Sequence, residues 1–191
     1  MADADNDTIA TAYLDEAFRG FRGYRRMAEG ALAQLSDEDF FYLPDPESNS
    51  VALLVKHMAG NLRSRWTDFL TTDGEKPDRN RDQEFILDVA DTRDALMRRW
   101  DESFNRVLDT INGLKPEDLT RTVYVRQEPH TVMQAINRSL MHTAYHVGQI
   151  LYLGKHRRGT GWKTLSVPKG KSAEFNALRP EDRKYKNPEK G

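Results

Sequence analysis

Apolar residues recur at helical spacing in four long stretches of the chain, which are separated by polar segments containing glycine and proline. Such periodicity is typical of amphipathic helices, whose apolar faces must be buried against one another. The pattern therefore predicts an all-α fold, a four-helix bundle with long loops and an irregular C-terminal tail. The predicted helices cover residues 7–35, 50–71, 91–113 and 131–158.

Cap and stop residues fix the predicted helix ends. Asn6 or Asp7 can cap the first helix, and Gly113 stops the third. The fourth helix has the best signal, because Thr131 and Gln134 have the spacing of a capping box, in which each side chain accepts the other's free backbone N–H. That helix is expected to continue to about residue 158, just before two glycines.

The segments between the predicted helices read as loops. SDEDFFYLPDPESNS breaks the helical pattern with two prolines, and TTDGEKPDRNRD is rich in turn residues. LTRTVYVRQ alternates enough to predict a short extended segment. We expect one domain over residues 1–178 and a disordered tail over 179–191, because the end of the chain is polar and contains proline and glycine.

Composition limits the function classes. With 29 basic and 30 acidic residues in 191, no net charge favours nucleic acid or anionic lipid. No apolar run approaches the ~20 residues that span a bilayer, and the first residues lack a secretory signal, so a cytoplasmic protein is expected. The chain has no cysteine, which excludes disulfides, thiolate metal sites and cysteine nucleophiles. Any metal must be held by histidine, carboxylate or amide oxygen.

Candidate chemistry centres on His142 and His146, which are four residues apart in the fourth helix. Positions four apart differ by only ~40° around a helix, so the two rings share a face, while Ile136 and Val147 lie on the other side. His57 likewise lies on a polar side of the second helix. A polar pocket shared by these two helices would explain both arrangements.

Three imidazoles from two helices can hold a divalent metal and leave positions open for water or substrate. The alternative is that His142 and His146 are hydrogen-bonded polar residues, and that His57 lies on a solvated helix face. The motif is not HExxH, since Thr143 stands where a zincin has its glutamate. No carboxylate lies in the histidine stripe as an obvious general base.

The chain resembles the DinB/YfiT-like superfamily of four-helix bundles, which carry one histidine on the second helix and HxxxH on the fourth. The matching segments are LLVKHMAGN, with His57, and HTAYHVGQI, with His142 and His146. GNLRSRWTDFLTTDGEKPDRNRDQEF and WKTLSVPKGKSAEFN resemble one branch of it, known as a domain of unknown function. The resemblance covers about residues 7–178.

This resemblance implies a divalent metal held by His57, His142 and His146, with zinc or nickel expected first and iron or manganese as alternatives. Characterised relatives include thiol transferases and isomerases that use a low-molecular-weight thiol, and metal hydrolases. The expected function is a metal-dependent transferase or hydrolase acting on a small-molecule substrate, with activated water or an external thiol as nucleophile. The alternative is a non-catalytic dimeric metal-binding or stress-response protein, so whether the protein is an enzyme stays open.

Four further polar residues lie near the histidines on the predicted helices. Asn61 and Gln149 can orient ligands or contact substrate. Arg65 and Arg138 can clamp an anionic group, because guanidinium pairs well with carboxylate or phosphate. The alternative for each is a surface residue in an ion pair.

Two segments and one helix face are candidates for closing the site or joining two copies. TTDGEKPDRNRD is expected to form a structured lid or an interface, and SVPKGKSAEFN either walls the pocket or is a solvated tail. The fourth helix carries Met141, Tyr145 and Tyr152 on a second apolar side, which predicts a buried face or a homodimer interface. His130 and His156 are not assigned to the metal.

Overall fold

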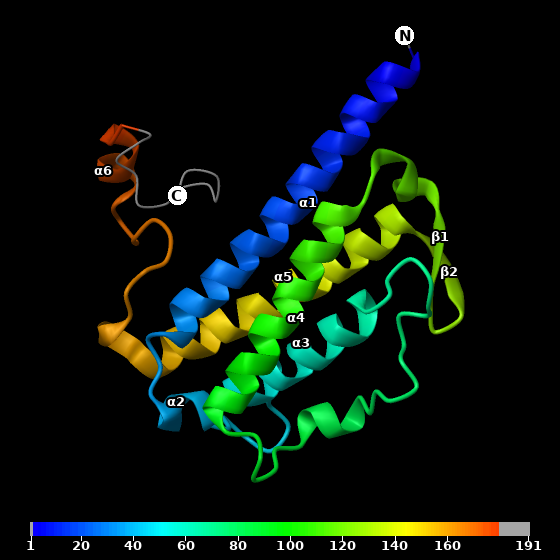
Figure 1. Ribbon diagram of the computed structural model, residues 1–191. Helices are drawn as coiled ribbons and strands as arrows, with labels where there is room; N and C mark the ends of the chain where they lie inside the picture. Colours follow the sequence, from blue (N-terminus) through cyan, green and yellow to red (C-terminus); the bar gives the residue numbers. More distant parts are fainter. Residues whose placement is uncertain (1, 180–191) are drawn as a thin grey trace.

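Four long helices form the bundle that the sequence predicts (Figure 1). This computed structural model describes residues 2–179, with side chains from residue 7 onward. Helix α1 contacts α5, α5 contacts α3, α3 contacts α4, and α4 contacts α1, so each long helix has two neighbours around the bundle. The long helices are α1 (Ala2–Leu32), α3 (Val51–Trp66), α4 (Arg93–Gly113) and α5 (Val132–Arg158).

The helix ends follow local capping chemistry, with small corrections to the predicted bounds. Helix α1 begins at Ala2, before the predicted cap, and α3 ends at Trp66 rather than near Thr71. The chain leaves α3 through Asp68, whose φ of 47° is incompatible with a continuing helix. The α5 capping box is confirmed: the Thr131 side chain accepts from Gln134 N, and Gln134 accepts from Thr131 N.

The prediction that residues 36–50 form only a loop was wrong. Helix α2 (Asp37–Phe41) begins at a capping box between Ser36 and Asp39 and buries Phe40 completely. The predicted extended segment is the first half of a hairpin, because β1 (Thr122–Val125) pairs antiparallel with β2 (Glu128–Thr131). The remaining elements are η1 (Asp82–Phe85), η2 (Pro116–Thr120), η3 (Gly159–Gly161) and α6 (Ser172–Ala177).

An aromatic core fills the space between the long helices. Phe21 of α1 meets Trp66 of α3 edge to face at 5.4 Å, and Trp100 and Phe104 of α4 lie 4.5 Å apart. All four side chains are buried. Burying such rings removes large apolar areas from water, and it fixes α3 against α1 and α4 before any polar contact is considered.

The C-terminal segment does not wall the pocket, contrary to one of the two expectations. Helix α6 lies apart from the bundle and is solvent-exposed over most of its residues (Figure 1). Leu165 instead packs against α1, where a Cβ on Gly30 would lie 3.0 Å from it. The tail predicted to be disordered, 179–191, lies outside the described residues from 180 onward. Over the described residues, no helix has the length and hydropathy needed to cross a bilayer.

Candidate metal centre

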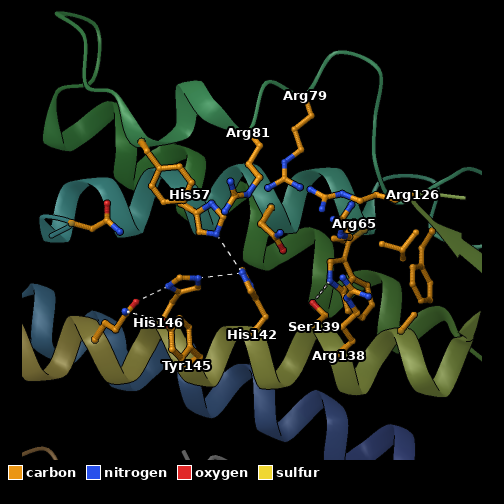
Figure 2. Close-up of a pocket in the computed structure, with 18 residues that line it drawn as sticks. His57, Arg65, Arg79, Arg81, Arg126, Arg138, Ser139, His142, Tyr145 and His146 are labelled. Atoms are coloured by element: carbon orange, nitrogen blue, oxygen red, sulfur yellow. Dashed lines mark hydrogen bonds between the residues drawn. The ribbon is translucent and has the colours of Figure 1, made fainter. Parts of the chain in front are cut away.

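Three histidines from two helices converge on one point, as the sequence predicts (Figure 2). His57 comes from α3, while His142 and His146 come from α5. The Nε2 atom of His142 lies 3.3 Å from Nε2 of His57 and 3.1 Å from Nε2 of His146. His57 and His146 are buried, at 3% and 7% exposure, so the alternative of a solvated face for His57 is wrong.

The outer ring nitrogens of two histidines are held by oxygen acceptors. His57 Nδ1 lies 2.8 Å from the Glu84 carboxylate, and His146 Nδ1 lies 2.7 Å from Gln149 Oε1. Both oxygens accept hydrogen bonds, so each Nδ1 carries the proton and each Nε2 of the neutral ring presents a lone pair to the centre. His142 Nε2 carries at most one proton, so it can donate to only one of the other two Nε2 atoms. A cation at the centre satisfies all three nitrogens.

The separations and the charge state both fit a metal. Two imidazole nitrogens bound to one zinc ion at about 2.0–2.1 Å with a tetrahedral angle are roughly 3.3 Å apart, close to the two separations from His142 Nε2. The candidate ligand atoms of all three histidines lie within 4.8 Å of one another. Burial, followed by the neighbouring His146 and His57, lowers the pKa of His142 to about 3. Burial also lowers the pKa of His146. Both rings are therefore neutral at pH 7, which is the form that binds metals.

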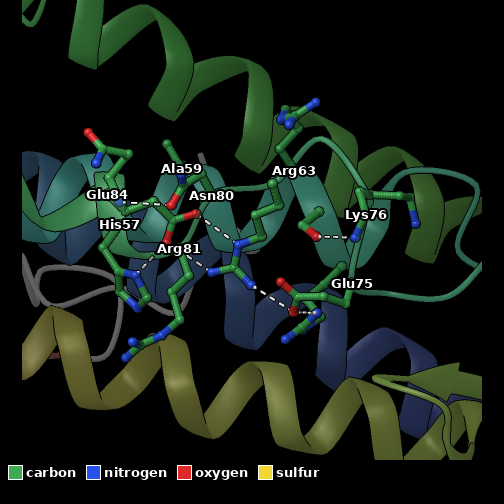
Figure 3. Close-up of polar contacts among 12 residues, drawn as sticks. His57, Ala59, Arg63, Glu75, Lys76, Asn80, Arg81 and Glu84 are labelled. Atoms are coloured by element: carbon green, nitrogen blue, oxygen red, sulfur yellow. Dashed lines mark hydrogen bonds and ion pairs between the residues drawn. The ribbon is translucent and has the colours of Figure 1, made fainter.

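Glu84 was missed by the sequence analysis, although it positions His57. It lies in the loop between α3 and α4, which we call the 67–91 loop, 27 residues from its histidine partner. Figure 3 shows Glu84 beside His57. Arg79 donates to both Glu84 oxygens, at 2.8 and 2.9 Å. Burial would raise the pKa of Glu84, but the hydrogen bonds from His57 and Arg79 lower it, so the carboxylate stays ionised.

Gly60 makes room for this carboxylate. A Cβ at that position would lie 2.3 Å from Glu84 Oε1, closer than any side chain tolerates. A glycine in the interior of α3 costs helix stability, roughly 1 kcal/mol relative to alanine. The signal in the sequence was therefore Gly60 itself, about one turn after His57. The period of the apolar residues alone did not identify Glu84 as the group that fills the space beside it.

A cavity of about 460 Å³ opens beside the histidines. It is lined by α3, α5, the 67–91 loop and the tip of the β-hairpin. The four additional polar residues predicted from the sequence, Asn61, Arg65, Arg138 and Gln149, all line it. His130 and His156 do not line it. Trp66 forms part of the floor and donates from Nε1 to Ser139 Oγ at 2.9 Å.

The 67–91 loop does form a wall of this cavity, as the lid interpretation of TTDGEKPDRNRD expects. Arg79, Arg81 and Phe85 line the cavity from this loop, and Phe85 stacks on His57 with ring centroids 4.7 Å apart. Ser64 of α3 ties the loop down by donating to Gly74 O at 2.8 Å. Met141, Tyr145 and Tyr152 are exposed on the single chain, so the homodimer stays a prediction.

Comparison with known families places the chain in one of them. The family described as "Protein of unknown function (DUF1572)" matches residues 8–171, which includes all three histidines, Glu84 and every residue that lines the cavity. No curated protein matches the chain.

Proposed function

We propose a function for this chain, which belongs to the DUF1572 family of proteins of unknown function, from the geometry of its histidine site. The protein is a metal-dependent transferase or hydrolase that acts on a small molecule. The observation that carries this proposal is the convergence of three Nε2 atoms beside a cavity of about 460 Å³. We also propose that the family is a branch of the DinB/YfiT-like superfamily, with zinc or nickel as the preferred metal and iron or manganese as alternatives.

The chain's own residues prepare the site in two ways. Glu84 and Gln149 each accept from an Nδ1 and so aim the Nε2 lone pairs of His57 and His146 at the centre. The cavity gives a substrate access to this centre, which a purely structural site would not need. A divalent cation held by three imidazoles lowers the pKa of a water or thiol that binds to it. A thiol must come from outside, because the chain has no cysteine.

Metal content is the direct test of the site. We expect near-stoichiometric zinc, nickel, iron or manganese, measured by mass spectrometry on protein purified without an affinity tag. His142→Ala should lose it, because only two of the three nitrogens remain. His156→Ala is the matched control, since His156 is an exposed histidine of the same helix outside the cavity. Wild-type protein that neither carries these metals nor takes up added zinc or nickel would overturn the proposal.

Turnover separates the enzyme from a non-catalytic metal-binding protein. One observation favours the latter: the described residues that line the cavity include no carboxylate that could act as a general base. Metal-loaded protein should hydrolyse members of a panel of small esters and amides, or consume added low-molecular-weight thiols with electrophilic substrates. A metal that only raises the unfolding temperature, with no turnover on either panel, would support the non-catalytic function.

A further inference from the structure

Five arginines line the cavity, and three of them gather at one end of it. Arg65, Arg126 and Arg138 lie to one side of the histidines, toward the hairpin (Figure 2). Arg79 and Arg81 reach the cavity from the 67–91 loop. The whole chain has a net charge of −1, so this concentration of positive charge is a local property and not a general one. Only Arg65 and Arg138 were foreseen from the sequence.

The arginines exceed the carboxylates available to them. One oxygen of Glu75 accepts from Arg65 at 2.9 Å, Arg126 at 3.1 Å and Arg79 at 3.3 Å. Glu84 accepts from Arg79 as well. Five guanidinium groups line the cavity, and none of the described residues that line it is a carboxylate.

Two of the arginines make no hydrogen bond to a carboxylate among the described residues. Arg81 approaches Asp82 at 3.9 Å and lies over the Phe85 ring, 5.1 Å from its centroid. Arg138 makes no hydrogen bond or ion pair with any residue in the described part of the chain, yet it lines the cavity. Burial, together with the charges of Arg79 and Arg126, lowers the pKa of Arg65. Because these guanidinium groups repel one another, an anion that binds among them stabilises the arrangement.

The Asp73 carboxylate stabilises a strained backbone turn that places Arg126 in this group. Arg126 and Gln127 form the hairpin turn with φ values of 55° and 65°, a conformation that normally selects glycine or asparagine. The Asp73 carboxylate accepts from both backbone N–H groups, at 2.8 and 2.7 Å, and so offsets the strain. A strained turn maintained by a dedicated carboxylate is typical of a functional position.

We propose that the cavity binds a small organic anion whose carboxylate or phosphate group lies among Arg65, Arg126 and Arg138. Guanidinium groups recognise both anions through paired hydrogen bonds. Arg138 lies one turn before His142, roughly 6 Å along the helix, and Arg65 lies two turns after His57, roughly 12 Å. The ligand therefore carries its anionic group roughly 6–12 Å from the atoms that reach the histidines. This last statement rests on the proposed function, whereas the anion site itself does not.

Calorimetric titration tests the anion site directly. Inorganic phosphate and succinate are titrated at low ionic strength into metal-free and zinc-loaded protein, for wild type, Arg138→Gln and Arg121→Gln. Arg121 is the matched control, because its half-exposed side chain lies outside the cavity and, among the described residues, forms an ion pair only with Asp118. We expect binding to metal-free wild type, weakened by added salt, and a dissociation constant about tenfold or more higher in Arg138→Gln alone. Arg126→Gln is a second variant with the same expected direction.

The outcomes separate this inference from the proposed function. Tighter binding of phosphate supports a phosphate-bearing ligand, and tighter binding of succinate supports a carboxylic acid. Binding to metal-free protein that carries no metal when purified would leave the anion site intact while the metal-dependent function fails. The inference is overturned if neither anion binds at millimolar concentration, or if Arg138→Gln and Arg126→Gln both bind as wild type does. It is also overturned if anions bind only to zinc-loaded protein and equally in all variants.

Discussion

Toward α4, helix α3 shares a buried apolar core, whereas toward α5 it faces the histidine cavity. On the α4 side, Ser103 donates to Ala59 O at 2.9 Å, and the fully buried Trp100 and Phe104 belong to the same core. On the α5 side, α3 presents His57 and Arg65 to a cavity. The contrast shows how the fold keeps polar groups close together: dense apolar packing fixes the backbone of α3, and a charged loop then closes its other side.

The charged side depends on contacts between distant segments. Glu84 and Arg79 of the 67–91 loop hold His57, and Glu75 of the same loop binds Arg126 of the hairpin. The loop is fastened at its far end by the buried Asp91, which accepts from Lys56 of α3 and from Arg99 of α4. The two sides of α3 should therefore respond differently to mutation, one through stability and the other through metal binding.

The largest effect is expected on the packed side. Phe104→Ala should lower the free energy of unfolding by about 3–5 kcal/mol, because it leaves a cavity in a fully buried aromatic cluster. The metal content of the folded protein should stay unchanged, since Phe104 does not line the histidine cavity. Urea denaturation and mass spectrometry measure the two quantities. Loss of metal from folded Phe104→Ala would show that the two sides are coupled, and Phe104→Leu should give a smaller loss of stability.

An intermediate effect is expected at the loop anchor. The Asp91 side chain is only 1% exposed, and Asp91→Asn should lower the free energy of unfolding at pH 7 by about 2–3 kcal/mol. Burial would raise the pKa of Asp91, but hydrogen bonds from Lys56 and from the backbone of Asp88 lower it.

The pH dependence of the stability loss in Asp91→Asn follows from the direction in which folding shifts the pKa of Asp91. Because the pKa of Asp91 is lower in the folded protein than the value of about 3.9 in the unfolded chain, its stabilisation is complete above that value. It is lost as the pH falls through the folded pKa. The difference between wild type and Asp91→Asn, measured by urea denaturation from pH 7 to pH 2.5, should therefore shrink below about pH 4. A difference that stays constant over this range would contradict the ion-pair assignment.

The smallest change is expected from Glu84→Gln, which should weaken metal binding about 10–100-fold while leaving the stoichiometry at saturation unchanged. A neutral amide accepts less strongly from His57 Nδ1 and leaves Arg79 with only its longer, 3.3 Å contact to the Glu75 carboxylate. Competition with a zinc chelator measures the affinity, and the exposed Glu117→Gln is the control. Gly60→Ala should act in the same direction, because its Cβ displaces Glu84. Wild-type affinity in both variants would remove Glu84 from the site.

Local patterns predicted most of the bundle. The capping box at Thr131 and Gln134 and the period of the apolar residues depend on neighbours within one or two turns, so they can be found in the sequence. Helix α2 was missed because it is only five residues long and two prolines follow it closely. The early end of α3 was missed because Asp68 adopts a left-handed conformation that the apolar pattern does not reveal.

The sequence by itself determined that His142 and His146 share one helix face, because helical geometry brings residues four apart together. Only the tertiary structure decided that Nε2 of His57, 85 residues from His142, lies 3.3 Å from Nε2 of His142, that Glu84 contacts His57, and that five arginines line the cavity. Glu84, Arg79 and Arg81 reach the site from the 67–91 loop, and Arg126 reaches it from the hairpin. The paths of both segments depend on contacts with α3 and with each other. Such contacts are not periodic, so they have no local signature in the sequence.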